Sequence, residues 1–557
     1  MRTVWAMLLA LATIPTVPQP ALAAWVPNGN PVCSAFNTQN AATLTSDGAG
    51  GVIIAWTDFR TGDTAFVYAQ RLTASGLPLW AIDGLHVSTS IGGADEPQII
   101  SDGADSAIIV WSDSRSGGSQ IDIYAQRING PGVTQWTPGG VAICTAANYQ
   151  LTPKMVGDGV GGAIITWYDW RNASHNDVYV QRVNSAGAVQ WTGNGVPMCV
   201  AAGNQSSPTI ASDGSSGAIV TWWDERSGAA DIHAQRVSAA GAPLWTLDGV
   251  VVCGSLGEQY SPKPVSDGAG GAIIAWEDLR GDADVYAQRL NGSGAAQWAV
   301  DGVVLTGAGF QGACDADSDG SGGALVAWID DRVSDSDVYV QRVNAAGVPQ
   351  WTAQGVALCV ATSAQSSVRV DSEGTGGAVL AWQDYRSGNG SVVYAQRVNA
   401  LGVVQWASNG AAVSQELGDQ YGADVLSDGA NGAFVCWTDN RAPATDIYAT
   451  RITAAPASVE TPSGPRSRIA CSAAPNPFRQ GTQLRIDSAD AAPVTVTIVD
   501  AGGRVVRVLT SPASSAGRHT IAFDGRDENG LVLPIGVYSY RATVAGSSAT
   551  GRMVVLR

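Results

Sequence analysis

Lysine is nearly absent from this chain of 557 residues, and acidic residues outnumber basic ones by 48 to 31. A formal charge of -17 argues against binding to nucleic acid or to anionic membrane surfaces, because both attract basic proteins. The charge favours solubility outside the cell or a cationic partner. Histidine is also scarce, and its four residues occupy unrelated places in the sequence. They form no Ser-His-Asp arrangement, and no Gly-x-Ser-x-Gly elbow can be assembled, so the sequence gives little support for catalysis.

Long apolar runs are missing as well. No segment after the first residues reaches the roughly 18 uninterrupted apolar residues of a membrane helix, so we predict no membrane span. Residues 1–23 have a charged tip, an apolar run and the small-x-small sequence Ala21-Leu22-Ala23, which together indicate a secretory signal peptide. A short transmembrane anchor is the weaker alternative, because three prolines interrupt the apolar run.

Cysteines at the paired spacing of zinc sites are lacking too. Five of the eight cysteines instead occupy one repeated place, four residues after a glycine, which serine or threonine fills in the other repeats. These residues are Cys33, Cys144, Cys199, Cys253 and Cys359, with Ser88, Thr306 and Ser414 as their equivalents. A place that accepts Cys, Ser or Thr needs a small buried side chain, so we predict mostly free thiols.

What the sequence does contain is internal repetition. A Trp-x-Asp-x-Arg signature recurs eight times at steps of 52 to 56 residues, and a second tryptophan recurs with it. The signature tryptophans are Trp56, Trp111, Trp167, Trp222, Trp276, Trp328, Trp382 and Trp437. The second series is Trp25, Trp80, Trp136, Trp191, Trp245, Trp298, Trp351 and Trp406. Recurrence at such a period indicates a propeller or another repeat array.

One repeat predicts four short strands separated by turns, as in a propeller blade. In residues 150–199 these are 153–156, 163–167, 177–183 and a fourth strand that begins at 189–191. The first repeat has only a fourth strand, in residues 24–45, whereas the last repeat lacks one. Each end therefore supplies what the other lacks, and we predict an all-β, eight-bladed β-propeller over residues 24–452, closed by its N-terminal strand.

A different domain follows the repeats. Residues 453–468 are rich in Pro, Ser and Ala, which is typical of a linker. Residues 469–557 contain five segments with the alternation of half-buried strands, and we predict a small Ig-like β-sandwich. The segments are 482–486, 494–499, 504–509, 519–523 and 536–542.

Several sequence motifs of this domain occur in a specific order. They are Pro475-Asn476-Pro477-Phe478, the segment 498–506, Ala516-Gly517-Arg518-His519, the segment 524–530, Gly536-Val537-Tyr538-Ser539-Tyr540 and the terminal 551–555. This pattern resembles the C-terminal sorting domain of type IX secretion cargo and the Ig-like domain of flagellar hook-cap (FlgD) proteins. The resemblance implies secretion or surface attachment. The repeats are loosely similar to sialidase-type blades, but the Asp of the sialidase box is missing, so that similarity concerns the fold alone.

The repeated Asp-x-Arg pairs are candidate ligand-binding residues, because eight of them on one propeller face form a ring of charges. They are Asp58 and Arg60, Asp113 and Arg115, Asp169 and Arg171, Asp224 and Arg226, Asp278 and Arg280, Asp330 and Arg332, Asp384 and Arg386, and Asp439 and Arg441. The alternative is structural: each pair fixes its own loop or a neighbouring blade. Repetition in every blade favours the structural role, since active sites break symmetry.

One stretch departs from the repeat. Asp315, Asp317 and Asp319 alternate before a glycine, as at the start of a calcium loop, although the terminal acidic ligand is missing. Calcium is thus a candidate cofactor, and an ordinary Asp-Gly hairpin turn is the alternative.

Together these features predict an exported or cell-surface binding or display module. Its partners would be an extracellular glycan or protein, and secretion or surface-attachment machinery that acts through residues 469–557. The alternative function is a carbohydrate-active, sialidase-like glycosidase on the same propeller. An asymmetric cluster of carboxylates or arginines near the central channel would distinguish the two.

Overall fold

The computed structural model describes residues 25–556 except 89–91, 104, 118–119, 308, 334, 389, 443, 454–468, 489–490, 501–504, 512–516 and 545–546. The chain divides into two compact units, Met1–Ser458 and Val459–Arg557. Every regular element of the described residues is a strand. The predicted signal peptide and all but the first residue of the predicted linker lie outside the described residues.

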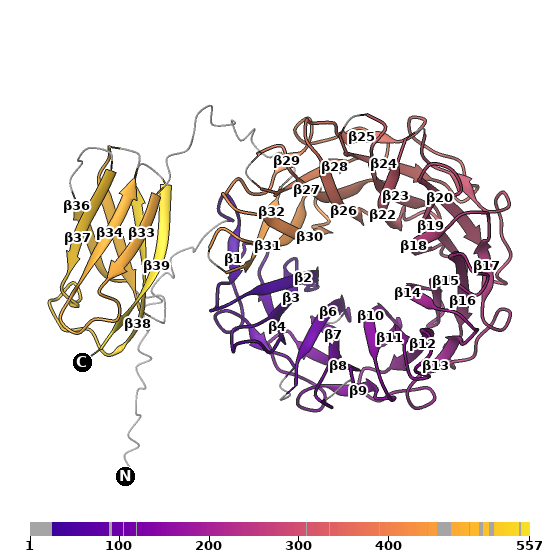
Figure 1. Cartoon of the computed structure of the whole chain (residues 1–557), viewed down its shortest axis with the longest axis horizontal. Helices are drawn as coiled ribbons and strands as arrows, with labels where there is room; N and C mark the ends of the chain where they lie inside the picture. The colour runs from indigo at the N-terminus through magenta and orange to yellow at the C-terminus, as the bar shows by residue number, and fades with distance from the viewer. Residues whose placement is uncertain are drawn as a thin grey trace, which may run out of the picture. The chain divides into compact units, whose positions relative to one another are not determined.

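The first unit is an eight-bladed β-propeller, and each blade is a four-stranded antiparallel sheet. The innermost strands surround the central opening (Figure 1). From blade one to blade eight they are β2 (Gln39–Ser46), β6 (Ala94–Ser101), β10 (Gln150–Gly157), β14 (Gln205–Ser212), β18 (Gln259–Ser266), β22 (Gln311–Ser318), β26 (Gln365–Ser372) and β30 (Gln420–Ser427). The second strands are β3 (Val52–Asp58), β7 (Ser106–Asp113), β11 (Ala163–Asp169), β15 (Ala218–Asp224), β19 (Ala272–Asp278), β23 (Ala324–Asp330), β27 (Ala378–Asp384) and β31 (Ala433–Asp439).

The outer half of each blade holds two more strands. The third strands are β4 (Phe66–Leu72), β8 (Asp122–Asn129), β12 (Asp177–Val183), β16 (Asp231–Val237), β20 (Asp284–Leu290), β24 (Asp337–Val343), β28 (Val392–Val398) and β32 (Asp446–Ile452). The fourth strands of blades one to seven are β5 (Leu85–His86), β9 (Val141–Cys144), β13 (Val196–Cys199), β17 (Val250–Cys253), β21 (Val303–Val304), β25 (Val356–Cys359) and β29 (Ala411–Ala412). The fourth strand therefore begins after the second tryptophan, and the prediction that it starts at 189–191 is wrong. Val189 instead forms an isolated bridge to Val183, and residues 190–191 belong to no strand.

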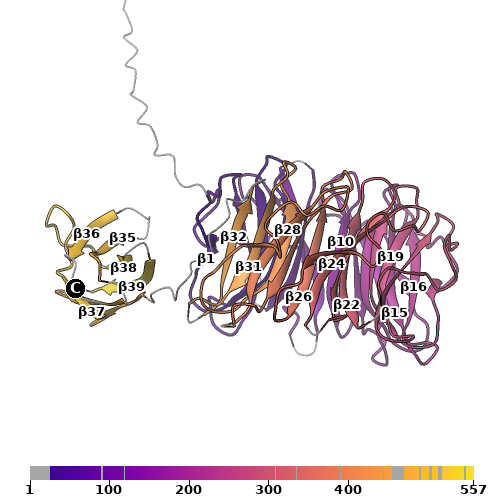
Figure 2. The same cartoon turned by 90° about the horizontal axis from the view of Figure 1, so that it is seen from above.

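The N-terminal strand closes the ring, as predicted. β1 (Asn30–Cys33) pairs antiparallel with β32 as the fourth strand of blade eight, with Asn30 opposite Ala449. Beside this strand, Trp25 donates from its indole to the carbonyl of Ala74 in blade one, at 3.0 Å. Figure 2 shows the same ring from the side, with the blade strands running between its two faces.

The signature tryptophans fill the hydrophobic cores between neighbouring blades, as Trp167 of blade three does with Ile108 and Val110 of blade two. All eight are fully buried, and a glycine just before the fourth strand lies against each indole. At Gly249, for example, a Cβ atom would lie 2.6 Å from Cη2 of Trp222. Gly249 also has a φ of 87°, so both the close approach and the backbone conformation require glycine there.

The second tryptophans join neighbouring blades. Trp298 of blade five donates to the carbonyl of Ala345 in blade six at 3.1 Å, and Gly347 lies against its ring. Arg289 of blade five donates to the same carbonyl at 3.0 Å. Trp25 and Arg451 repeat this arrangement at the closure, since both donate to Ala74. Within the described residues, a tryptophan indole donates to a carbonyl of the next blade at seven of the eight junctions, including the closing one.

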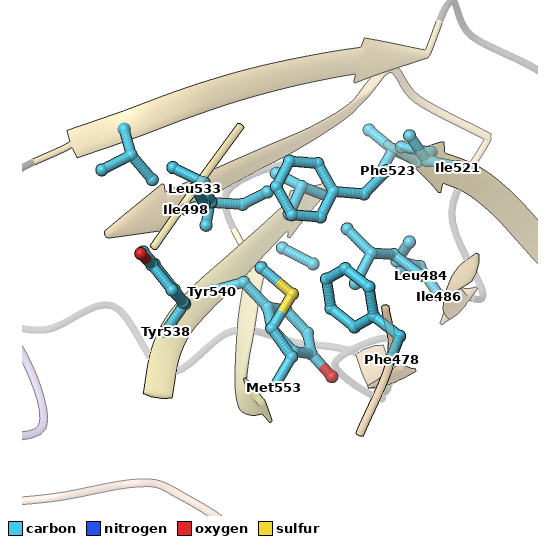
Figure 3. Close-up of a cluster of buried hydrophobic side chains, with 14 of the residues drawn as sticks. Phe478, Leu484, Ile486, Ile498, Ile521, Phe523, Leu533, Tyr538, Tyr540 and Met553 are labelled. Atoms are coloured by element: carbon cyan, nitrogen blue, oxygen red, sulfur yellow. The ribbon is translucent and has the colours of Figure 1, made fainter. Parts of the chain in front are cut away.

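The second unit is a β-sandwich of two sheets. One sheet has the order β33 (Ile469–Ala474), β34 (Thr482–Ser488), β37 (Gly517–Phe523), and the other β36 (Val505–Ser511), β35 (Val494–Val499), β38 (Gly536–Val544), β39 (Ser547–Val555). Figure 3 shows the side chains of its core, among them Phe478, Phe523 and Met553. The sequence predicted five of these strands, and β33 and β39 are additional.

We expect loss of the closing strand to destabilise the whole propeller. Deleting residues 25–36 exposes the edge of β32 and removes the buried side chains of Val32 and Cys33. Burial of one aliphatic side chain contributes roughly 1.5–3 kcal/mol. Calorimetry should show a lower and broader unfolding transition, whereas deleting 469–557 should leave the propeller transition in place. A deletion variant that unfolds as cooperatively and at the same temperature as the parent would refute closure by β1.

Candidate functional site

The aspartate of each Asp-x-Arg pair is the centre of a buried network. In blade five, Asp278 accepts hydrogen bonds from Nε1 of Trp276 at 2.8 Å and from the backbone amide of Arg280 at 3.0 Å. The guanidinium of Arg280 binds both carboxylate oxygens, at 2.8 and 2.6 Å. It also donates to the carbonyl of Asp301 at 2.8 Å and lies over the ring of Tyr286. Three strands of the blade meet at this carboxylate.

Charge pairing outweighs burial at this network. Burial alone would raise the pKa of Asp278, but the hydrogen bonds from Arg280 and Trp276 hold that pKa below its ordinary value. The hydrogen bond to Asp278 in turn raises the pKa of Arg280. Both groups therefore stay ionised, as a buried pair requires.

The same network occurs in all eight blades. Every one of the aspartate side chains is fully buried, and the arginine side chains are 18–27% exposed. Blade four differs in one respect, because His233 replaces the tyrosine and stacks on Trp222. The aspartates are Asp58, Asp113, Asp169, Asp224, Asp278, Asp330, Asp384 and Asp439, and their partners are Arg60, Arg115, Arg171, Arg226, Arg280, Arg332, Arg386 and Arg441.

Arg115 of blade two shows why this set is a poor candidate for ligand binding. Its guanidinium binds the two carboxylate oxygens of Asp113, at 2.7 and 2.6 Å, and donates to the carbonyl of Gly139 at 2.7 Å. The group also lies over the ring of Tyr124, 3.6 Å from its centroid. The geometry thus disagrees with a ligand-binding role for Arg115, because the guanidinium is used inside its own blade instead.

The other seven arginines hold their aspartates in the same way. Each binds both oxygens of the carboxylate two residues earlier in the chain, and the tryptophan indole shares one of those oxygens. With these donors and acceptors already paired, we infer that the sixteen residues serve the blades and not a ligand.

A small side chain is needed beside this network, which explains the repeated cysteine. The sulfur of Cys253 lies 3.6 Å from Oδ2 of Asp278 and within the reach of Arg280. In blade one the equivalent Ser88 accepts a hydrogen bond from the amide of Val67. All eight cysteines are free, which confirms the prediction of unpaired thiols.

A second set of ion pairs lies at the opposite ends of the strands. The arginine of each third strand binds the acidic residue that starts the turn between the first and second strands. Asp319 belongs to this set: it binds Arg342 at 2.9 Å and accepts the amides of Ser321 and Gly323, each at 2.7 Å. Asp267 makes the equivalent contacts one blade earlier, so Asp319 has the ordinary hairpin role.

The other two candidate calcium ligands point to a neighbouring strand. Asp315 accepts the amide of Val370 at 3.2 Å, and Asp317 accepts the amide of Ser372 at 2.8 Å. Both carboxylates thus link blade six to blade seven. Within the described ranges no group of three or more His, Cys, Asp or Glu side chains is arranged to hold a metal ion. The calcium hypothesis for Asp315, Asp317 and Asp319 therefore gains no support from the geometry.

The blades differ from one another in the central channel. A cavity of about 530 Å³ lies there, lined by residues from all eight innermost strands. Each of these strands has a bulge after its second residue, which bends the strand, and the fifth residue follows the bulge. From blade one to blade eight the fifth residues are Thr43, Gln98, Lys154, Thr209, Lys263, Asp315, Arg369 and Asp424. All eight line the cavity.

Charges of both signs occupy this cavity. Lys154 donates to Oε1 of Gln98 at 3.2 Å, and Nζ of Lys263 lies 3.7 Å from Oδ1 of Asp315. Burial lowers the pKa of Lys154 to about 8, and the nearby cations Lys263 and Arg369 add to this effect. Burial also raises the pKa of Asp424, and Arg369 opposes that change.

Asp371, two residues after Arg369 on β26, links blade seven to blade eight. Its carboxylate accepts the amide of Ser427 at 2.7 Å. Burial raises its pKa to about 7, with Asp317 and Asp424 contributing in the same direction.

The channel residues are not among those predicted from the sequence, because their side chains differ from blade to blade at a shared strand position and so form no repeated motif. One available signal was the position of the rare lysines, because Lys154 and Lys263 each lie five residues into an innermost strand.

We expect removal of one buried aspartate to destabilise the propeller. Asp278→Ala leaves Arg280 and the Trp276 indole without their acceptor, and breaking a buried pair costs roughly 3 kcal/mol. Thermal unfolding should show the loss, and ligand binding measured below the transition should persist. Asp282→Ala is the matched control, because it removes the same charge from an exposed position of the same loop. An unchanged unfolding temperature together with lost binding would contradict the structural role.

Comparisons with known proteins identify the second unit. Residues 473–548 match the family model described as the FlgD Ig-like domain, which confirms that resemblance. Among curated proteins, none matches the chain by sequence. No helix of the described residues is long and apolar enough to cross a membrane.

Similar solved structures are distant. One is PorZ of Porphyromonas gingivalis, an essential surface component of its type-IX secretion system, with 13% identity, a TM-score of 0.31, and coverage of 93% of this chain and 70% of that chain. Another is an alpha-L-arabinanase of Penicillium chrysogenum, with 11% identity, a TM-score of 0.32, and coverage of 55% and 93%. At such TM-scores these likenesses carry no argument about function.

Proposed function

We propose that this protein is an exported or cell-surface binding module. Residues 1–23 direct export, the propeller of residues 24–452 binds an extracellular glycan or protein, and residues 453–468 link it to the Ig-like domain of residues 469–557. The Ig-like domain serves sorting or surface attachment. The ligand occupies the central channel.

One observation carries the binding proposal: the blades depart from their symmetry in the channel. The Asp-x-Arg networks and the turn ion pairs repeat in all eight blades and are used within the fold. The fifth residues of the innermost strands include neutral, acidic and basic side chains, and they line a cavity of about 530 Å³. Small-ligand sites are usually concave and have a few convergent polar groups.

The alternative is a carbohydrate-active hydrolase in the same channel. The raised pKa of Asp371, about 7, favours it, since a carboxyl group that stays protonated near neutral pH can act as a general acid. Two observations favour binding instead. Asp315, Asp371 and Asp424 each accept a hydrogen bond from a backbone amide of the next blade, so these carboxylates have a structural role. In addition, Arg369 is the one arginine that lines the described cavity, whereas a sialidase-like site needs three.

A bulky side chain in the channel should abolish binding. Thr209→Trp fills part of the cavity from blade four, and we expect at least a tenfold loss of affinity for whichever ligand a glycan array or a screen of extracellular proteins identifies. Val189→Trp adds the same bulk at an exposed position outside the channel and should bind normally. Equal binding by the Thr209→Trp variant would exclude the channel as the site. Release of a sugar from the bound glycan by the parent protein would favour the hydrolase.

We expect the Ig-like domain to determine the final location. A chain that ends at residue 460 keeps the signal peptide and the complete propeller. It should cross the inner membrane and accumulate in the periplasm, whereas the full chain reaches the surface. Fractionation of cells followed by immunodetection measures both. Truncated protein on the surface or in the medium at the level of the full chain would remove the sorting role.

A further inference from the structure

Lysine is the rarest charged residue of this protein, and its side chains are concentrated in one cavity. Lys154 and Lys263 are the only lysines of the chain, and both line the central channel. Arg369 lines it from the same strand position in blade seven. All other described arginines of the propeller belong to the two repeated sets of ion pairs. The unrepeated cations of an acidic protein therefore meet in the channel.

These three cations line the same cavity. Lys263 and Arg369 lie close enough to Lys154 to lower its pKa, after the larger effect of burial, while Glu96 and Asp424 act in the opposite direction. Like charges that are brought together inside a fold cost free energy unless an anion is placed between them. A bound anion would remove this cost.

The acidic residues of the cavity leave the cations partly unpaired. Lys263 has one ion pair, with Asp315 at 3.7 Å, but the other oxygen of Asp315 accepts the amide of Val370. Arg369 is exposed to the cavity, and its guanidinium makes no hydrogen bond or ion pair within the part of the chain that the structure describes. The planar guanidinium group of Arg369 is therefore available to bind a ligand.

We infer that the channel binds the carboxylate of an acidic saccharide, with Lys154, Lys263 and Arg369 as the donors. This inference rests on the proposed binding function and names the ligand class of that site. A guanidinium binds a carboxylate through two parallel hydrogen bonds, and the ammonium groups add charge without a strict geometry.

The rest of the lining fits a saccharide better than a free phosphate or sulfate. Glu96, Asp315 and Asp424 lie in the same cavity and repel a dianion more strongly than a single carboxylate, whereas their oxygens accept hydrogen bonds from hydroxyl groups. Gln98 and Thr152 add neutral polar groups. The volume of about 530 Å³ is within the range of small-ligand sites.

Binding can be measured through the titration of the lysine side chains themselves. Reductive methylation of the chain from residue 24 onward with ¹³C-formaldehyde labels Lys154, Lys263 and the amino terminus and keeps their charge. The Lys154→Arg variant identifies the signal of Lys154, which should titrate near pH 8 in the free protein. Glucuronate or galacturonate should raise this midpoint, because a bound carboxylate favours the charged amine, and glucose should not. A midpoint that neither uronate moves would overturn the inference.

Calorimetric titration of variants tests the three donors. Lys154→Gln, Lys263→Gln and Arg369→Gln should each weaken uronate binding about tenfold or more, and affinity should fall as the pH rises through 8. Arg479→Gln removes the same charge from an exposed position of the Ig-like domain and should bind as the parent does. Phosphate or sulfate that binds more tightly than both uronates would overturn the saccharide assignment.

The outcomes separate this inference from the function on which it rests. A neutral glycan or a protein that binds in the channel, with uronates inert, would keep the binding function and reject the acidic saccharide. A propeller that binds no glycan, protein or anion would reject both. Uronate binding that the three channel substitutions leave unchanged would place the site elsewhere and reject the inference.

Discussion

Each blade depends on one buried carboxylate. The aspartate at the end of the second strand accepts hydrogen bonds from the indole N–H of the signature tryptophan and from the guanidinium of the arginine two residues later. This arginine also donates to the connection that leads to the fourth strand. A charge without exposure to water is tolerated only when its hydrogen bonds are complete. Tryptophan, aspartate and arginine must therefore occur together, and this requirement explains why the signature persists in all eight repeats.

The contacts that join neighbouring blades also close the ring. Every blade must fit two neighbours, and in the described part of the chain the indole contact recurs at seven of the eight junctions between blades. At the junction, Trp25 and Arg451 donate to Ala74 much as Trp298 and Arg289 donate to Ala345 between blades five and six. The N-terminal strand is thus an ordinary fourth strand that another part of the chain supplies. Blade eight therefore has four strands like every other blade, and the edge of β32 is covered.

Symmetry also limits where a ligand site can arise. Residues that hold the blades cannot vary without loss of stability, whereas the innermost strands meet only at the channel and their inward side chains are free to differ. Lys154, Lys263 and Arg369 there belong to no repeated contact, while Asp315, Asp371 and Asp424 also link adjacent blades. The channel therefore combines structural acids with cations that have few partners, which is the chemical basis of the proposed recognition.

The sequence by itself determined the number of blades, the closure and the second domain, because these depend on periodicity and on what each end of the chain lacks. It also indicated a structural role for the Asp-x-Arg pairs, and contacts such as those of Arg115 with Asp113 and Gly139 show what that role is. Only the tertiary structure decided which side chains share the channel, because residues as far apart as Lys154 and Arg369 meet through ring geometry and not through sequence spacing. For the same reason, Asp317 and Asp319 are close in sequence but contact a neighbouring blade and a hairpin turn respectively.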